Sequence, residues 1–227
     1  MTNTDILIDR ATSSDIDFIA NTIVEAEKSG TDNFGLANVF GIDEETMRGY
    51  IAEMLDEEID GCEFSLSSFL VARHQGKPVA AFAGWVEGYN EDNLPSSMLK
   101  SNLLSYTLPQ ECVLRSQTVA DVVRSLQIAR EKGTYQLEYS YTLPEYRGQG
   151  IMKDIINAHI AECQQNTSSI QDGGIKKMQV HVFANNPAAI RTYESCGFKI
   201  VKRIHSEEEN VTQYFPDHTL LLMEMNI

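Results

Sequence analysis

The sequence predicts a mixed α/β fold, because short strand-like apolar runs alternate with segments of helical periodicity along most of the chain. Its 227 residues are enough to bury a sizeable core, and 42% hydrophobic with 22% charged residues is an ordinary composition for a globular protein. No internal repeat and no convincing linker interrupts the chain. We therefore expect a single mixed α/β domain over residues 1–227.

The first sixty residues predict one strand and two helices. Ile6-Leu7-Ile8 is an apolar run that fits a strand, and Thr12-Ser13-Ser14-Asp15 supplies a cap before apolar residues at helical spacing. A second helix is expected from Asp43 to about Asp60, where the acidic first turn complements the helix dipole.

The middle of the chain predicts a hairpin followed by a less regular segment. Apolar runs at 69–72 and 79–83 flank a turn-rich stretch, which is typical of two antiparallel strands. Residues 88–133 begin as a polar loop, and two helical stretches are expected near 95–106 and 116–131. We interpret 88–133 as a helical insertion.

The last part of the chain has the sharpest pattern. A β-rich run ends at Pro144, which cannot extend a strand ladder, and a helix with an apolar stripe begins near Gly150. A polar loop, a strand, a helix that starts at Asn186-Pro187 and two closing strands follow. The expected strands of this part are 134–143, 178–184, 198–204 and 219–225.

The charge of the chain argues against a nucleic-acid partner. With 33 acidic and 18 basic residues the formal net charge is −15, and no cluster of Lys and Arg suited to phosphates is present. Residues 1–60 hold 15 acidic and 3 basic residues, a net of −12. An acidic face can attract a cationic substrate such as an amine, although a solvated face that keeps the protein soluble is the simpler interpretation.

The cysteines and the N-terminus indicate a reducing compartment. Cys62, Cys112, Cys163 and Cys196 are widely spaced and form no metal-like pattern with histidines, so we expect free thiols and no metal site. The N-terminus lacks a basic segment followed by an apolar run, and no apolar stretch approaches the roughly 18 residues that span a bilayer. We therefore expect a cytoplasmic protein with no membrane partner.

Residues 140–153 predict an anion-binding turn. A strand ends, two glycines allow the backbone to approach a ligand closely, and a helix leaves with its free N–H groups pointing back. Such a helix start binds anions, with a dipole contribution of roughly 0.3–1 kcal/mol, and Arg147 and Lys153 can add charge. The pattern is neither a Walker A loop nor a complete dinucleotide fingerprint, and Gly-x-Gly alone favours a plain turn before a helix.

A second segment, 185–198, makes a functional interpretation of residues 140–153 more specific. Asn186 is a good helix cap, Pro187 suits the first helical position and Gly197 suits a left-handed stop, so local rules explain these residues without any function. They do not explain why this unit follows the first one about forty residues downstream.

Together the two segments resemble the signatures of the GNAT superfamily of acetyltransferases. YRGQGIMK after a strand is similar to its acetyl-CoA signature, and NNPAAIRTYESCGF is similar to its second signature. The resemblance covers roughly 134–204 and extends to the order of elements before residue 88. It implies a mixed, mostly antiparallel sheet with a V-shaped splay between the fourth and fifth strands, and helices on both faces.

The resemblance also implies an acetyl-CoA site in that splay. Strand backbone would bind the pantetheine arm, turn amides the pyrophosphate, and the Asn186 side chain the arm again. Met152 stands where the family has a small residue, and its side chain can point into the core and leave the amide usable. The implied binding residues are Ser140, Tyr141, Thr142, Arg147, Gly148, Gln149, Gly150, Ile151, Met152, Lys153 and Asn186.

Three residues are candidates for proton transfer by the same resemblance. Tyr193 matches the family's general acid, which protonates the thiolate as CoA leaves, and a core tyrosine is the simpler alternative. Glu138 and His181 are the candidates for the general base, with Glu138 preferred, and a relaying water is the third option. By the two-residue period of a strand, Glu138 is expected on the same face as Ser140 and Thr142.

The predicted function is therefore acetyl-CoA-dependent N-acetylation of a primary amine, on a small molecule or a peptide, by direct attack on the thioester. The alternative is a catalytically silent acyl-CoA-binding module that senses or scaffolds, which needs the turn amides but not the catalytic side chains. The 88–133 insertion is expected to wall the acceptor pocket or to form a dimer contact, so a homodimer is also considered.

Overall fold

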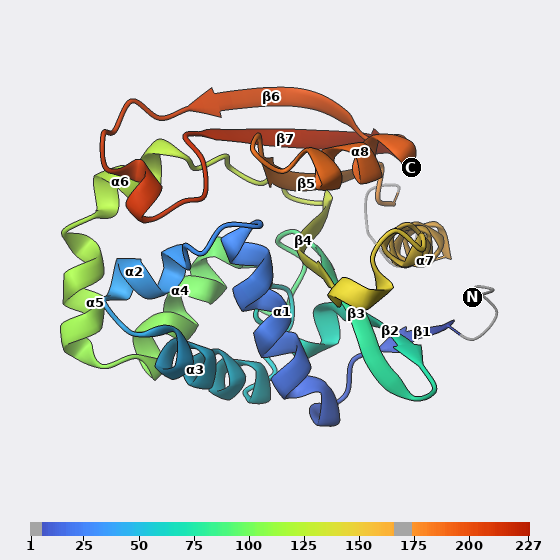
Figure 1. Cartoon of the computed structure of the whole chain (residues 1–227), viewed down its shortest axis with the longest axis horizontal. Helices are drawn as coiled ribbons and strands as arrows, with labels where there is room; N and C mark the ends of the chain where they lie inside the picture. The colour runs from blue at the N-terminus through green and yellow to red at the C-terminus, as the bar shows by residue number, and fades with distance from the viewer. Residues whose placement is uncertain (1–5, 166–173) are drawn as a thin grey trace.

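The computed structural model describes residues 6–165 and 174–227, and its central element is a mixed sheet of seven strands in the order β1-β2-β3-β4-β5-β7-β6 (Figure 1). Neighbouring strands are antiparallel except β4 and β5, which run parallel. The strands are β1 (Ile6–Arg10), β2 (Phe69–His74), β3 (Lys77–Val86), β4 (Tyr135–Thr142), β5 (Lys177–Phe183), β6 (Lys199–His205) and β7 (Thr219–Asn226).

Helices cover both faces of the sheet, as expected. α1, α3 and α4 share an apolar cluster on one face, and α7 packs against the other face (Figure 1). None of the helices in the described ranges is long and apolar enough to cross a membrane. The helices are α1 (Ile16–Lys28), α2 (Gly35–Phe40), α3 (Glu44–Asp56), α4 (Ser96–Thr107), α5 (Gln110–Gln117), α6 (Ala120–Ser125), α7 (Ile151–Gln165) and α8 (Pro187–Ser195).

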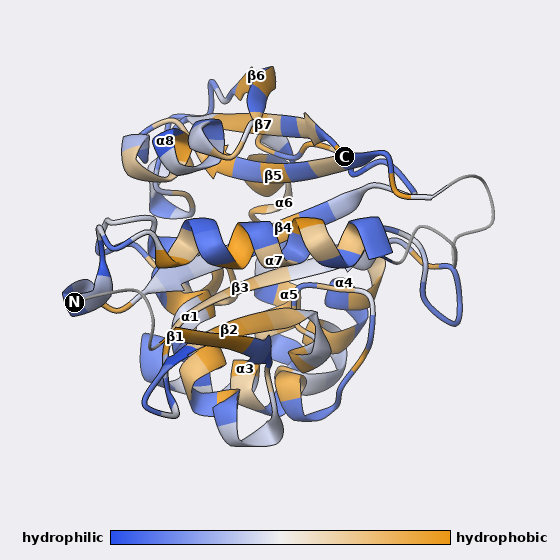
Figure 2. Ribbon diagram, turned by 90° about the vertical axis from the view of Figure 1, so that its right-hand side faces the viewer, coloured by the Kyte–Doolittle hydropathy of each residue, from blue (hydrophilic) through white to orange (hydrophobic). Residues whose placement is uncertain are grey.

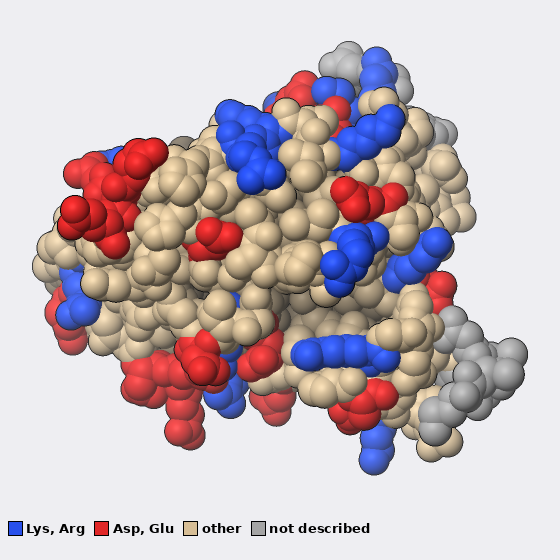
Figure 3. All heavy atoms as spheres, turned by 45° about the horizontal axis from the view of Figure 1, so that its top comes forward, with Lys and Arg blue, Asp and Glu red and all other residues tan. Residues whose placement is uncertain are grey.

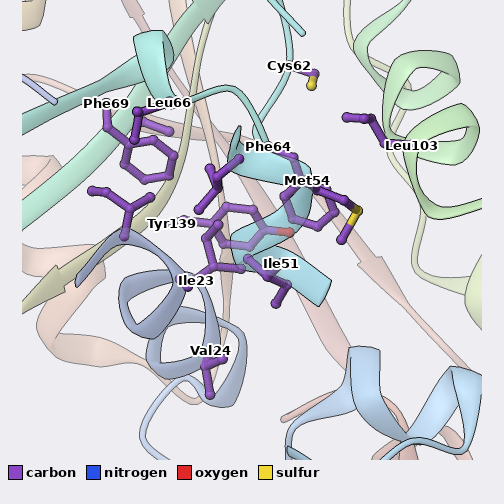
Figure 4. Close-up of a cluster of buried hydrophobic side chains, with 14 of the residues drawn as sticks. Ile23, Val24, Ile51, Met54, Cys62, Phe64, Leu66, Phe69, Leu103 and Tyr139 are labelled. Carbon is purple, nitrogen blue, oxygen red and sulfur yellow. The ribbon is translucent and has the colours of Figure 1, made fainter. Parts of the chain in front are cut away.

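The apolar cluster on the α1 face ties two helices to β4. Figure 4 shows Ile23 of α1 and Ile51 and Met54 of α3 close to the rings of Phe64 and Tyr139, and the two rings stack with their centroids 6.1 Å apart. The three aliphatic side chains have no exposed surface. Burying a side chain of this size contributes about 1.5–3 kcal/mol, so this cluster fixes the position of β4 relative to α1.

The opposite face is covered by α7, whose residues alternate between hydrophobic and hydrophilic along its length (Figure 2). The apolar stripe expected from the sequence is confirmed. Its buried members are Ile151, Ile155, Ile156 and Cys163, while Met152 and Ile160 are partly buried against the same cluster.

A buried histidine joins α7 to the middle of the sheet. The Nε2 atom of His159 lies 3.1 Å from the Phe82 carbonyl oxygen, and its Nδ1 atom lies 2.8 Å from the Tyr135 hydroxyl. Gly84 leaves the room for this contact, since an added Cβ would come within 2.5 Å of the Tyr135 ring and 2.8 Å of the His159 ring. Burial lowers the pKa of His159 to about 3, so the ring is neutral in the folded protein.

The expected splay lies between β4 and β5. These strands pair through three residue pairs only, Tyr135 with Met178, Gln136 with Gln179 and Leu137 with Val180. Beyond them β4 continues beside β3 and β5 continues beside β7. In the described ranges, the C-terminal halves of the two strands therefore have no strand partner on the edges that face each other.

A β-bulge at Tyr139 changes which face the end of β4 presents. Tyr139 has a φ of 58°, and the β3–β4 register shifts between the pairs Ala83–Glu138 and Ala81–Tyr141. Direct cross-strand partners share a face. Glu138 thus lies with Ala83 on the α1 face, whereas Thr142 lies with Ala80 on the α7 face.

The expectation that Glu138 shares a face with Ser140 and Thr142 was therefore wrong. The extra residue of the bulge reverses the alternation beyond it. Nothing in the composition of the strand signals the bulge, because Tyr139 is not a residue type that favours a positive φ.

The insertion contains three helices where two were expected. The predicted helix at 116–131 covers the end of α5, the whole of α6 and a non-helical stretch that leads to β4. At the break, the hydroxyls of Ser116 and Thr118 donate to the carbonyls three residues before them, at 2.8 Å and 2.7 Å. Such local bonds compete with helix continuation. The short α2 was not predicted at all.

Candidate active site

The turn from β4 to α7, residues 142–153, is called the phosphate turn below. Gly148 and Gly150 have φ values of +73° and +83°, and apart from their own chain neighbours no atom of the described residues lies within 4 Å of a Cβ built on either of them. The space in front of the helix is therefore open, and the first amides of α7 have no partner within the helix. Open glycine backbone before free helical amides fits a phosphate group.

The side chains of the phosphate turn hold its shape. The Nε atom of Arg147 donates to the Thr142 carbonyl at 3.0 Å, and its guanidinium lies 5.7 Å from the centre of the Tyr141 ring. The Nε2 atom of the Gln149 side chain donates to the Glu145 backbone carbonyl at 3.0 Å.

Met152 and Lys153 point in different directions. Met152 packs partly buried against the apolar cluster of the α7 face, which is the inward direction expected for a bulky residue at this position. Lys153 is exposed. The replacement of the family's small residue therefore occurs on the core side of the helix.

Asn186 caps the N-terminus of α8 and also contacts the residue that ends α1. Its Oδ1 atom accepts from the Ala189 amide at 3.1 Å, which confirms the expected helix cap. Its Nδ2 atom donates to the Ser29 hydroxyl at 3.1 Å, immediately after the end of α1. Asn186 thus links the helix that follows β5 to the helix that leads away from β1.

Tyr193 connects α8 to the unpaired half of β4. Its hydroxyl lies 3.2 Å from the Ser140 hydroxyl, and its ring stacks on Phe82 with the centroids 6.1 Å apart. Only 4% of Tyr193 is exposed, and burial raises its pKa to about 12. The phenol therefore carries its proton near neutral pH and can donate it.

Glu138 and His181 meet across the splay. The Nδ1 atom of His181 lies 3.6 Å from Glu138 Oε2, although the two residues belong to different strands. Ninety per cent of the His181 side chain is buried, and among the described residues its Nε2 atom has no hydrogen-bond partner. Burial alone would raise the pKa of Glu138, but contacts with His181 and Arg130 outweigh it and lower the pKa to about 2.

A group of charged residues surrounds this pair on the α1 face, and we call it the charged cluster. The Lys100 ammonium donates to the Tyr139 hydroxyl at 2.8 Å, and that hydroxyl donates to Glu27 Oε1 at 3.0 Å. Lys100 also lies 3.4 Å from Glu63. The members of the charged cluster are Glu27, Glu63, Lys100, Arg130, Glu138 and His181.

Sequence reasoning found two of these six residues. Glu27, Glu63, Lys100 and Arg130 were missed, because each comes from a different segment and none belongs to a motif. The general acidity of residues 1–60 was the one signal, and it does not single out Glu27.

The two candidate bases lie on one face of the sheet and the candidate acid lies on the other. The two faces meet at the splay. Ser140 and Tyr193 belong to the α7 side, and Glu138 with His181 belongs to the α1 side. Within the described residues, no group of three or more His, Cys, Asp or Glu side chains could hold a metal ion.

Acidic and basic side chains are unevenly distributed over the surface. On the face in Figure 3, Asp and Glu gather toward the left and lower edges, and Lys and Arg gather toward the top and right.

Comparison with known proteins identifies one family. The model of the "Acetyltransferase (GNAT) family" matches residues 38–198, which include β4, the phosphate turn and α8. No curated protein matches the sequence significantly.

Several solved structures share the fold. An N-acetyltransferase from Staphylococcus aureus Mu50 has a TM-score of 0.66 at 16% identity, covering 96% of this chain and 100% of that one. A ribosomal-protein-alanine N-acetyltransferase from Brucella melitensis has a TM-score of 0.54 at 15% identity, covering 97% and 99%. A putative acetyltransferase from Salmonella typhimurium, solved with acetyl-CoA, has a TM-score of 0.52 at 13% identity, covering 97% and 93%.

Proposed function

Because the chain belongs to the acetyltransferase (GNAT) family, we propose that it transfers an acetyl group from acetyl-CoA to a primary amine of a small molecule or peptide. The observation that carries this proposal is the splay, which is bordered by a phenol on one face and by a carboxylate–imidazole pair on the other. A module that only binds an acyl-CoA has no use for a buried imidazole nitrogen that lacks a partner among residues 6–165 and 174–227.

The donor would be held by the phosphate turn and the end of β4. Amides at the start of α7 suit the pyrophosphate, and the unpaired backbone of β4 suits the pantetheine arm. Asn186 follows β5, the strand on the other side of the splay, and its side chain donates to Ser29 at the end of α1. The proposed binding residues are Ser140, Tyr141, Thr142, Arg147, Gly148, Gln149, Gly150, Ile151, Met152, Lys153 and Asn186.

We assign the general base to His181 rather than to Glu138. The low pKa of Glu138, about 2, makes its carboxylate a weak proton acceptor, and Arg130 already donates to it at 2.8 Å. Within the described part of the chain the Nε2 atom of His181 has no hydrogen-bond partner, and Glu138 stands beside its Nδ1 atom, so the carboxylate orients the ring with Nε2 as the acceptor. This assignment depends on the contacts of both residues and was not available from the sequence.

The reaction then follows from these positions. The neutral amine attacks the acetyl carbonyl, the C–N bond forms and the C–S bond breaks. His181 Nε2 takes the proton that the amine loses, and Tyr193 gives its proton to the departing thiolate. A β4 amide beyond Leu137 polarises the carbonyl as negative charge develops, and solvent returns both side chains to their starting states.

Two further observations bear on the acceptor pocket and on the cellular location. The insertion supplies Lys100 and Arg130 to the charged cluster, which supports a role for 88–133 in walling the acceptor pocket. All four cysteines are free, which supports a cytoplasmic location. A homodimer is a further proposal, and analytical ultracentrifugation would test it.

A screen of amines, polyamines, aminoglycosides and peptides for CoA release tests the proposed activity. We expect at least one class to give CoA and the acetylated amine in equal amounts. Thermal-shift measurements with acetyl-CoA, CoA and NAD test the ligand separately. Stabilisation by the CoA species without turnover on any amine would support the silent binding module, and no stabilisation by either CoA species would contradict both functions.

A further inference from the structure

Arg130 is a residue of the insertion that contacts Glu138 of the proposed catalytic pair. It follows α6 in the non-helical stretch before β4, and its side chain is 14% exposed. Its Nη2 atom donates to Glu138 Oε2 at 2.8 Å, and its Nη1 atom donates to the Ser96 hydroxyl at 2.8 Å and lies 3.2 Å from Glu63 Oε2. The guanidinium also lies 5.0 Å from the centre of the Trp85 ring.

Arg130 and His181 approach the same atom. His181 Nδ1 lies 3.6 Å from Glu138 Oε2, the oxygen that already accepts from Arg130. The bonds to Glu63 and Ser96 anchor the guanidinium from the other side, so it holds the Glu138 carboxylate in one orientation. A positive charge at this oxygen also weakens its attraction for a proton on the neighbouring imidazole.

We propose that Arg130 is a positioning residue for the acetyl transfer: it orients Glu138 beside His181 and keeps the imidazole available as a proton acceptor. The inference rests on the proposed function, because it assumes that His181 is the base. It assigns to the insertion a direct part in the chemistry of the site, in addition to any part in recognising the acceptor.

Other charged groups near the pair would remain unchanged when Arg130 is replaced. Each contributes to the field at Glu138, at His181 or at Arg130 itself. They are Glu27 on α1, Glu63 before β2, Glu87 after β3, Lys100 on α4, Tyr139 on β4 and Tyr193 on α8.

The alternative is that Arg130 only ties the insertion to the sheet. In that case its loss would lower the stability and the amount of active enzyme but would leave the pH dependence of the active fraction unchanged. The pH–rate profile therefore separates a positioning role from a purely structural one.

The experiment compares the pH dependence of kcat/KM in the wild type with that of Arg130→Met and Arg130→Lys. We expect Arg130→Met to move the acidic limb of the profile to higher pH, because the substitution removes the positive charge that lies beside Glu138 Oε2. Arg130→Lys should move it back toward the wild type. An acidic limb that stays in place in Arg130→Met would overturn the inference.

Arg73→Met is the matched control. The Arg73 side chain is 13% exposed, and it donates to two carboxylates, Asp9 at 2.8 Å and Asp15 at 2.7 Å, on the far side of β2. We expect this variant to lose stability without moving the profile. If both variants moved the profile equally, the effect would be structural and the inference would be wrong.

A charge-balanced variant covers the case in which Arg130→Met does not fold. Arg130→Met with Glu63→Gln removes one positive and one negative charge together, and Glu63→Gln alone is its reference. The double variant should show the upward shift and the single variant should not. A wild type that acetylates no amine would contradict the proposed function, whereas a wild type that turns over with an unmoved profile in the double variant would contradict only the role of Arg130.

Discussion

The phosphate turn and the charged cluster sit at the same splay and are built in opposite ways. The turn is one continuous segment, exposed to solvent, and offers mainly backbone amides. The cluster brings together side chains from six separate segments and is largely buried, with Glu63 only 2% exposed. A site for a phosphate can thus be local, because amides suffice, whereas a site for proton transfer needs side chains held by the whole fold.

The largest expected effect comes from the centre of the cluster. His181→Ala should lower kcat by about 10²–10⁴-fold, because a positioned base contributes that much to a rate, while the KM for acetyl-CoA stays within a small factor. Steady-state kinetics with the best amine measure both. His205→Ala, an exposed strand histidine on β6, is the control and should be neutral. If His181→Ala turned over at the wild-type rate, a group other than His181 would have to be the general base.

The second largest effect is expected from substituting a glycine of the phosphate turn. Gly150→Ala should raise the KM for acetyl-CoA by about tenfold, since the new methyl group would fill the open space in front of α7. Alanine at a positive φ also costs about 1–2 kcal/mol of stability.

Gly76→Ala separates these two effects. Gly76 has a φ of +77° with no atom within 4 Å of its added Cβ, like Gly150, but it lies in the turn between β2 and β3. We expect the same loss of stability in denaturant unfolding with an unchanged KM. Equal KM values for the two variants would mean that the turn does not contact the donor.

The charged cluster should also affect how the stability of the fold depends on pH in the acidic range. Glu138 has a pKa of about 2 in the folded protein and about 4.3 when unfolded, so its ionisation stabilises the fold above pH 4.3 and this contribution is lost as the pH falls toward 2. The free energy of unfolding of the wild type, measured with denaturant, should therefore fall as the pH is lowered from 4.3 to 2. Glu138→Gln should show a shallower decline there, and an identical slope in both proteins would argue against an ionised, stabilised carboxylate.

The smallest effect is expected at the edge of the turn. Lys153→Ala should raise the KM for acetyl-CoA about two- to fivefold, because an exposed charge contact contributes roughly 0.3–1 kcal/mol. Salt should reduce the difference. Lys199→Ala, an exposed lysine on β6, provides the comparison and should leave the KM unchanged.

The same contrast explains what could be predicted from the sequence. The strand, turn and helix around Gly150 follow from local rules and were placed within one or two residues, and so was the cap at Asn186. The hairpin and the splay were also predicted, the splay through resemblance to the family.

The remaining features depend on contacts between distant segments. The bulge at Tyr139 arises in the β3–β4 pairing, so the two-residue period gave Glu138 the wrong face. Arg130 reaches Glu138 only because the chain leaves α6 as a non-helical stretch, where a continuous helix had been expected. Glu138 was preferred as the base because neither the bulge nor the contact with Arg130 can be inferred from the sequence.

The central claim is that the splay performs a transfer and does not merely hold a ligand, and Tyr193→Phe tests it most directly. The substitution removes one oxygen atom from a buried ring and leaves the phosphate turn untouched. Acetyl-CoA affinity by calorimetry and single-turnover acetylation of the best amine should be measured on the same preparation. The account predicts an unchanged Kd and a rate at least about 100-fold lower. An unchanged rate would contradict it.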